Sequence, residues 1–119
     1  MNVNGLYIVI IAHFIGDFVL QSDWMATNKS KLFEALCLHI VVYFVTLICA
    51  GIIVFGAQRG DAIIYFALLN ASLHMVIDFI TSQITSDLWK RNKRHWFFTT
   101  IGFDQMIHVI LLIATLNLF

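Results

Sequence analysis

Seven ionisable side chains stand inside the most apolar parts of this sequence, where charge is costly. They are His13, Asp17, His39, His74, Asp78, Asp104 and His108. Six of them form three pairs four residues apart, and this spacing places both members of a pair on one face of a helix. A charged side chain inside a membrane costs several kcal/mol, so such a cluster indicates a functional site. Three carboxylic acids and four imidazoles, with no Lys or Arg at the same depth, predict a cation site.

The donor set favours a divalent transition metal. Imidazole nitrogen together with carboxylate oxygen suits Zn, Mn or Fe better than Ca or Mg, which prefer oxygen ligands alone. Seven candidate ligands exceed the four of one structural zinc site, so we expect one or two ions. We predict His39 to be a ligand or a general base, and Asn70 and Gln105 to orient ligands or substrate. The same His and Asp side chains can also form a buried hydrogen-bonded network or a proton relay.

The composition is typical of a membrane protein. Of 119 residues, 61% are hydrophobic and 12% are charged, and the mean hydropathy is +0.88. A soluble domain of this length needs far more charged surface. The net charge is zero, which argues against a nucleic-acid partner. The first apolar segment lacks the basic start of a secretory signal and contains two candidate ligands, so we expect it to be a retained helix.

Four apolar segments predict an all-α fold with four membrane-spanning helices. They run from about Leu6 to Trp24, Glu34 to Phe55, Ala62 to Leu88 and Phe97 to Phe119. The segments are continuously apolar, which argues against the alternating pattern of a β-barrel. Short polar connections make consecutive helices antiparallel neighbours. We therefore expect one transmembrane domain, a four-helix bundle that covers residues 1–119.

The basic residues predict the orientation of the bundle. Lys29 and Lys31 lie in the first loop and four basic residues lie within residues 90–94, whereas the second loop has only Arg59. The positive-inside rule then places loops one and three in the cytoplasm and both termini outside, in the inner (plasma) membrane of a bacterium. At 1.5 Å per residue, the Asp residues and His39 fall roughly 7 to 18 Å below the cytoplasmic interface. Four helices would thus bring their polar groups to one depth.

The two halves of the chain resemble each other. The motif HxxxDF begins at His13 and again at His74, and each copy is followed by Ser-Asp, a Trp and an Asn-Lys. In the helices that follow, His39 and His108 each precede a Thr-Leu pair by seven residues. Two hairpins inserted in the same direction are related by a pseudo-two-fold axis along the membrane normal. This axis would make the two HxxxD helices face each other.

The motifs HFIGDFVLQSDWMATNK (residues 13–29), LHIVVY (38–43), HMVIDF (74–79) and FDQMIH (103–108) carry a family resemblance. The whole chain resembles the small bacterial and phage membrane proteins grouped as domain of unknown function 3307. That resemblance implies an integral membrane protein without an assigned activity. A looser similarity, in residue type and setting only, links the chain to bacterial inner-membrane proteins described as metal-dependent hydrolases.

Two classes of function fit these observations. The first is a membrane-embedded metal-dependent hydrolase that acts on a lipid or a lipid-linked ester or phosphoester near the cytoplasmic leaflet, with His39 and Gln105 as catalytic residues. The second is a protein that transports or senses a divalent cation or protons, or a non-enzymatic membrane factor with a buried network. The outer halves of the helices have few polar residues, which favours a hydrolase or sensor over a channel. Expected partners are membrane lipid and a small-molecule or lipid substrate, and a homo-oligomer is compatible with the sequence.

Overall fold

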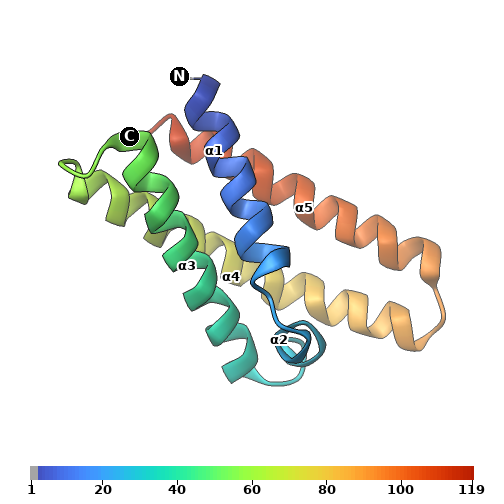
Figure 1. The fold of residues 1–119 in the computed structure, drawn as a ribbon. Coiled ribbons are helices and arrows are strands. Elements are labelled where there is room, and N and C mark those ends of the chain that lie inside the picture. Colours follow the sequence, from blue (N-terminus) through green and yellow to red (C-terminus); the bar gives the residue numbers. More distant parts are fainter. Residues whose placement is uncertain (1–2) are drawn as a thin grey trace.

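The computed structural model describes residues 3–119, which are almost entirely helical and contain no β-strand (Figure 1). The elements in chain order are α1 (Val3–Phe14), the π-helix η1 (Ile15–Val19), α2 (Asp23–Asn28), α3 (Phe33–Phe55), α4 (Gly60–Lys90) and α5 (Arg94–Leu116). The predicted all-α class is confirmed.

Three of these helices, α3, α4 and α5, are long and apolar enough to cross a membrane. At 1.5 Å per residue, the 31 residues of α4 extend about 46 Å, beyond a hydrocarbon core of about 30 Å. The shorter apolar stretch Val3–Val19 comprises α1 and η1. Large hydrophobic side chains are exposed along all of these segments, among them Tyr7, Ile53, Val76 and Phe98. Such a surface is typical of a protein that contacts lipid.

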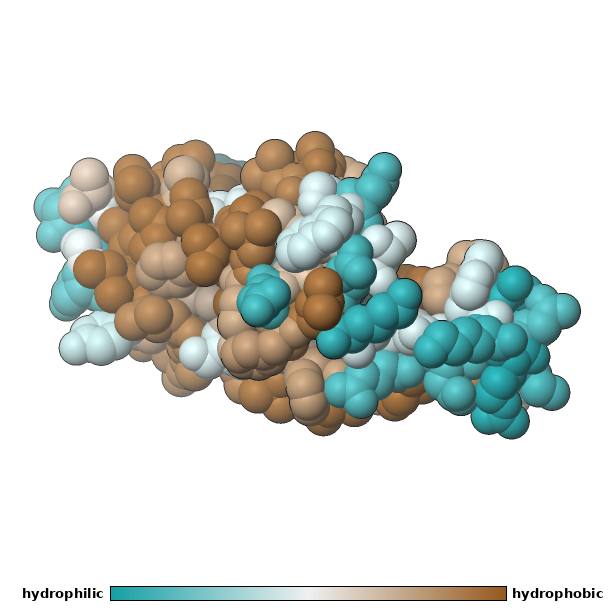
Figure 2. Space-filling view, turned by 90° about the horizontal axis from the view of Figure 1, so that it is seen from below, coloured by the Kyte–Doolittle hydropathy of each residue, from teal (hydrophilic) through white to brown (hydrophobic). Residues whose placement is uncertain are grey.

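The surface polarity follows the long axis of the molecule. Figure 2 shows a broad hydrophobic area with a small hydrophilic group at the end near the α3–α4 connection. A larger hydrophilic area covers the opposite end, toward the turn between α4 and α5. That turn carries Lys90, Arg91, Lys93 and Arg94. The ends of the long helices are therefore polar and their middle parts apolar, as a membrane-spanning arrangement requires.

The packing of the helices places α1 and α4 at diagonal positions. α4 packs along α3 and α5, and α1 also packs against α3 and α5 (Figure 1). A hydrophobic core fills the half of the molecule near the chain termini. Its buried side chains include Val9, Tyr43, Leu47, Phe66 and Leu112. The predicted site residues lie beside this core, toward the connections α1–α3 and α4–α5.

The first apolar segment is not the continuous helix expected from Leu6 to Trp24. α-Helical geometry ends at Phe14, the wider turn of η1 follows, and residues 20–22 are not helical before α2 begins. The hydroxyl of Ser22 accepts a hydrogen bond from the backbone N–H of Met25 at 3.2 Å, which caps a new helix. Ser followed by Asp is a helix-start signal, so this break was visible in the sequence and the expectation of one helix was wrong.

The other boundaries differ from expectation by a few residues. α3 ends where Gly56 adopts a positive φ of 83°, a conformation that glycine accepts without steric cost. α5 starts at Arg94 and ends at Leu116, three residues earlier at each end than expected. The long hairpin α4–α5 therefore extends further toward its basic turn than the apolar pattern indicates.

Candidate metal centre

The structure gathers all seven predicted site residues in one buried cluster. η1 contributes Asp17 and α1 contributes His13, α3 contributes His39, α4 contributes His74 and Asp78, and α5 contributes Asp104 and His108. Each is at most 8% exposed. The i,i+4 spacing accounts for the common face of each pair, and the packing of four segments brings the faces together.

η1 and its glycine determine how Asp17 enters the cluster. π-Helical turns occur frequently at functional sites, because the additional residue per turn changes the direction of a side chain. A Cβ atom on Gly16 would lie 3.1 Å from Cδ2 of Tyr43 and 3.3 Å from Cβ of Thr46. The absence of a side chain therefore allows η1 to approach α3 closely, which brings Asp17 toward His39.

The first ligand group contains Asp17, His39, His74 and Asp78, whose donor atoms lie within 4.8 Å of one another. Oδ1 of Asp17 is 3.1 Å from Nε2 of His39 and 3.2 Å from Nε2 of His74. The two Nε2 atoms are 3.1 Å apart, and Oδ2 of Asp78 is 3.3 and 3.6 Å from them. A tetrahedral metal with bonds of about 2.0–2.1 Å has ligand atoms about 3.3 Å apart. The observed separations fit that geometry.

Hydrogen bonding alone satisfies this group poorly. Each Nε2 atom carries at most one proton, yet each faces the other imidazole and two carboxylates at 3.1–3.6 Å. The Nδ1 atoms of His39 and His74 are buried and have no hydrogen-bond partner among residues 3–119. Four donor atoms that converge on one point resemble a ligand shell more closely than a closed hydrogen-bonded network.

A second group shares one residue with the first. Asp78, Asp104 and His108 also place donor atoms within 4.8 Å of one another. Nε2 of His108 is 3.4 Å from Oδ1 of Asp78 and 3.5 Å from Oδ2 of Asp104. Asp78 thus directs Oδ2 to the first group and Oδ1 to the second, so its carboxylate could serve both groups. The buried His and Asp groups could hold a metal ion, and their number and arrangement suit one ion or two.

His13 lies outside both ligand groups. Its Nε2 donates to Oε1 of Gln105 at 2.9 Å, because the amide nitrogen of Gln105 already donates to Oδ2 of Asp17 at 2.7 Å. The neutral ring then accepts a hydrogen bond from the Tyr43 hydroxyl at Nδ1, at 3.0 Å. The structure therefore places His13 behind Asp17, where it orients the ligand shell through Gln105.

Gln105 and Thr81 hold the carboxylates in place. Besides its bond to Asp17, Nε2 of Gln105 donates to Oδ2 of Asp104 at 3.1 Å. The hydroxyl of Thr81 donates to Oδ1 of Asp104 at 2.7 Å. The orienting contacts expected of Gln105 are present. Asn70 has a different role, because its amide bonds to the hydroxyl of Thr115 at 2.9 Å and joins α4 to α5 away from the cluster.

Lys29 corrects the expectation that no Lys or Arg reaches the depth of the cluster. Its ammonium donates to Oδ2 of Asp78 at 2.8 Å, and its side chain is 17% exposed. The chain breaks after η1 and returns through α2, and this return brings Lys29 under the ligand groups. A lysine assigned to a cytoplasmic loop therefore supplies one positive charge to a site with three acids.

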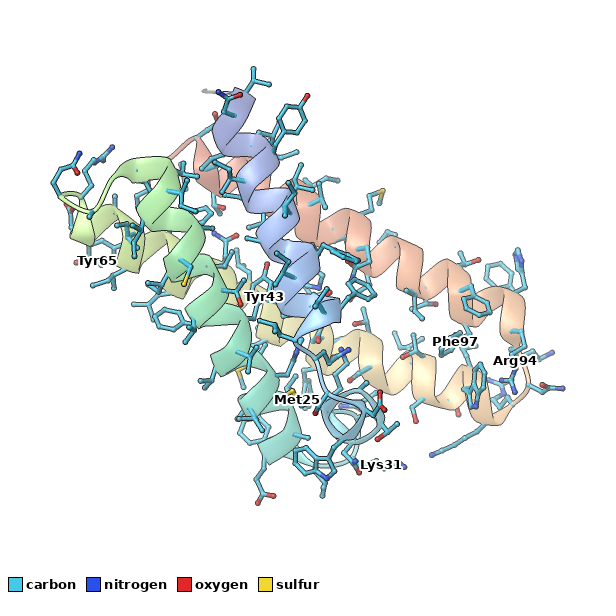
Figure 3. All side chains as sticks on the ribbon, viewed as in Figure 1. Met25, Lys31, Tyr43, Tyr65, Arg94 and Phe97 are labelled. Carbon is cyan, nitrogen blue, oxygen red and sulfur yellow. The ribbon has the colours of Figure 1, made fainter. Side chains whose placement is uncertain are left out.

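Tyr43 is a second residue that sequence reasoning missed. Figure 3 shows it at the centre of the molecule. Its ring stacks on His74 with centroids 4.0 Å apart, and His74 stacks on His108 at the same distance. Tyr43 follows His39 by four residues, as Thr81 follows Asp78 by three, so helical spacing could have indicated both.

A cavity of about 600 Å³ adjoins the cluster and leads away from the hydrophobic core. Asp17, Asp78 and Asp104 line one end of it. Residues 26–27 and 29–31 and the ends of α4 and α5 near their turn line the rest. Both Lys31 and Phe97 line this cavity, and in Figure 3 Lys31 lies beside α2 at the bottom of the view, whereas Phe97 lies on α5 near the α4–α5 turn. The candidate ligands can therefore be reached from the side of the first and third loops.

The family model described as a protein of unknown function, DUF3307, matches residues 6–119 of this chain. Because the match covers nearly the whole sequence, the chain belongs to this family. No curated protein and no solved structure matches it.

Proposed function

We propose that this member of the DUF3307 family is a membrane-embedded, metal-dependent hydrolase that acts on a lipid or a lipid-linked ester or phosphoester. The observation that carries the proposal is the pair of ligand groups sharing Asp78, placed at the inner end of a cavity. Two adjacent metals clamp the attacking and leaving oxygens of an ester or phosphoester and activate water near neutral pH. Zn, Mn or Fe suits the mixed nitrogen and oxygen donors.

The residues have distinct proposed roles. Asp17, His39, His74 and Asp78 hold one ion, and Asp78, Asp104 and His108 hold a second. The geometry favours His39 as a ligand over a general base, because its Nε2 faces the other ligands and its Nδ1 is buried away from the cavity lining. Gln105 positions Asp17 and Asp104 through its amide.

The membrane arrangement is proposed on the same grounds as the sequence prediction. α1 with η1, α3, α4 and α5 form a four-helix bundle in the bacterial inner membrane, with both termini extracytoplasmic. The diagonal placement of α1 and α4, each between α3 and α5, supports a pseudo-two-fold relation between the HxxxD helices. The accumulation of basic residues near the cavity mouth supports a cytoplasmic opening.

The competing class is a non-enzymatic protein in which the buried His and Asp side chains form a network without a metal. The position of Lys29 supports this class. One ammonium compensates one of the three carboxylates, and protonated imidazoles could compensate the others. Cation transport receives less support, because Val9, Leu47, Phe66 and Leu112 close the outer half with apolar side chains. A permeation route requires polar groups there.

Metal analysis of the purified protein in detergent separates these classes. We expect at least one transition metal per chain, a strong loss of metal in Asp17→Asn, and no loss in Asp61→Asn, whose side chain is exposed at the start of α4. The neutral amide keeps the shape of the carboxylate but binds a cation weakly. Metal-free wild-type protein whose melting is unchanged by zinc would refute the metal centre.

Hydrolysis is tested with the metal-loaded protein. Incubation with a mixed lipid extract should release a water-soluble phosphate or headgroup that mass spectrometry detects, and His39→Ala should abolish the release. Metal flux into proteoliposomes without any lipid product would instead identify a transporter.

A further inference from the structure

The cavity beside the ligand groups has two chemically different walls. α4 contributes the hydroxyl side chains Thr81, Ser82, Thr85 and Ser86. Their spacing of one and four residues places them on one helix face. Phe18, Trp89, Phe97 and Ile101 supply large apolar side chains to the same cavity. A cavity lined by both hydroxyl and large apolar side chains suits an amphiphile better than a water-soluble molecule.

One hydroxyl on the polar wall has no partner. Oγ of Ser82 is buried and forms no hydrogen bond within the part of the chain that the structure describes, and the residue is 7% exposed. Its neighbours are occupied, because Thr81 donates to Asp104 and Thr85 donates to the carbonyl oxygen of Ser82 at 3.1 Å. A buried polar atom without a partner is costly, so a lining hydroxyl of this kind indicates a ligand group that bonds to it.

The charged residues of the cavity indicate the sign of the charge on that ligand. Lys29, Lys31 and Lys90 all line it, and the acids are confined to the inner end. An ammonium has three donors, whereas Asp78 is the one hydrogen-bond acceptor found for Lys29 among residues 3–119. Lys29 lines the cavity and bonds to Asp78 of the first ligand group, so its remaining donors are available to an anion in the cavity.

We propose that the cavity binds an amphiphile with a phosphate headgroup, which Lys29 and Ser82 hold beside the metal ligands while its chain lies against Phe97 and Ile101. The proposal rests on the hydrolase function above and narrows its substrate class. A phosphate offers acceptors to both the ammonium and the hydroxyl, and the charge-assisted bond to Lys29 is the stronger of the two. Lys29 thus binds Asp78 on one side and the substrate phosphate on the other.

The test measures binding without turnover. Purified protein in detergent with zinc chloride is mixed with a phosphonate analogue of phosphatidic acid, whose carbon–phosphorus bond cannot be hydrolysed. Phosphatidylcholine and diacylglycerol with the same acyl chains compete with it, and native mass spectrometry counts the bound lipid. We expect the phosphonate to bind preferentially, and Lys29→Gln to weaken its binding roughly tenfold to a hundredfold, the range for loss of a hydrogen bond to a charged group.

Two further variants distinguish binding within the cavity from general electrostatic attraction to the basic residues. Lys93→Gln removes the same charge from the α4–α5 turn outside the cavity lining, and we expect a change of less than about twofold, because exposed charges are screened. Thr85→Trp fills the cavity without altering charge, and it should abolish binding while the protein still melts cooperatively. This variant keeps the test valid if Lys29→Gln fails to fold.

Several results would overturn the proposal. Equal binding of the phosphonate and diacylglycerol, which has no phosphate, would remove the phosphate preference, and equal losses in the Lys29 and Lys93 variants would assign the effect to the basic turn. If inorganic phosphate or glycerol phosphate binds as tightly as the phosphonate, the ligand needs no acyl chain, and the proposal of an amphiphile is refuted. Because no turnover is measured, a failure of the hydrolase function leaves these outcomes interpretable.

Discussion

The pair formed by Lys29 and Asp78 makes a quantitative prediction about the metal centre. Their polar atoms are 2.8 Å apart, Asp78 has a side chain that is 2% exposed, and Lys29 is 17% exposed. Removing one partner of a buried ion pair costs about 3–5 kcal/mol, because the other charge is left uncompensated. Because Lys29 is partly exposed, we expect a cost at the lower end of this range. In chelator, Lys29→Met should therefore lower the free energy of unfolding by about 3 kcal/mol.

Zinc should reduce that loss. An ion held by the ligand groups compensates Asp78 in place of the ammonium, so with saturating zinc we expect Lys29→Met to cost only about 1 kcal/mol. Reversible unfolding in mixed micelles, followed by tryptophan fluorescence, measures both values. The double variant Lys29→Met/Asp78→Asn removes both charges and should be more stable in chelator than Lys29→Met alone. An equal loss with and without zinc would show that no ion binds beside Asp78.

The remaining predictions concern topology and helix packing. Cysteines are introduced at Ser30 and at Asn92 in a background without the native cysteines. Both should react only with a reagent that enters the cytoplasm. Labelling of either cysteine from outside would contradict the proposed orientation and the cytoplasmic opening of the cavity. Gly16→Val should destabilise the protein by about 1–3 kcal/mol and reduce its metal content, because the new side chain displaces Tyr43. Gly102→Val is the control, since a Cβ there meets nothing within 4 Å, and comparable losses in both would contradict the close approach of η1 to α3.

Helical periodicity was sufficient to predict much of the candidate site. Residues four apart share a helix face whatever the helix packs against, so the pairs that begin at His13, His74 and Asp104 could be assigned before any contact was known. These inferences depend on local geometry alone.

Local geometry also explains where prediction failed in the first apolar segment. A π-helical turn and a capped restart cost little in an apolar segment, and hydropathy does not register them. The expected helix from Leu6 to Trp24 therefore breaks after Val19, although Ser22 carried a visible capping signal. That break reverses the chain and sends Lys29 back to Asp78.

The sequence by itself determined the all-α class, the apolar segments and the faces that carry His and Asp, because each follows from composition and the helical repeat. Only the tertiary structure decided which of those groups share a ligand shell. Asp78 is common to two groups, whereas His13 lies outside both and bonds to Gln105, since these positions depend on how far each helix is rotated and displaced against its neighbours. The countercharge from Lys29 was likewise decided in three dimensions, because a side chain 49 residues away in sequence meets Asp78 only after the chain has turned back.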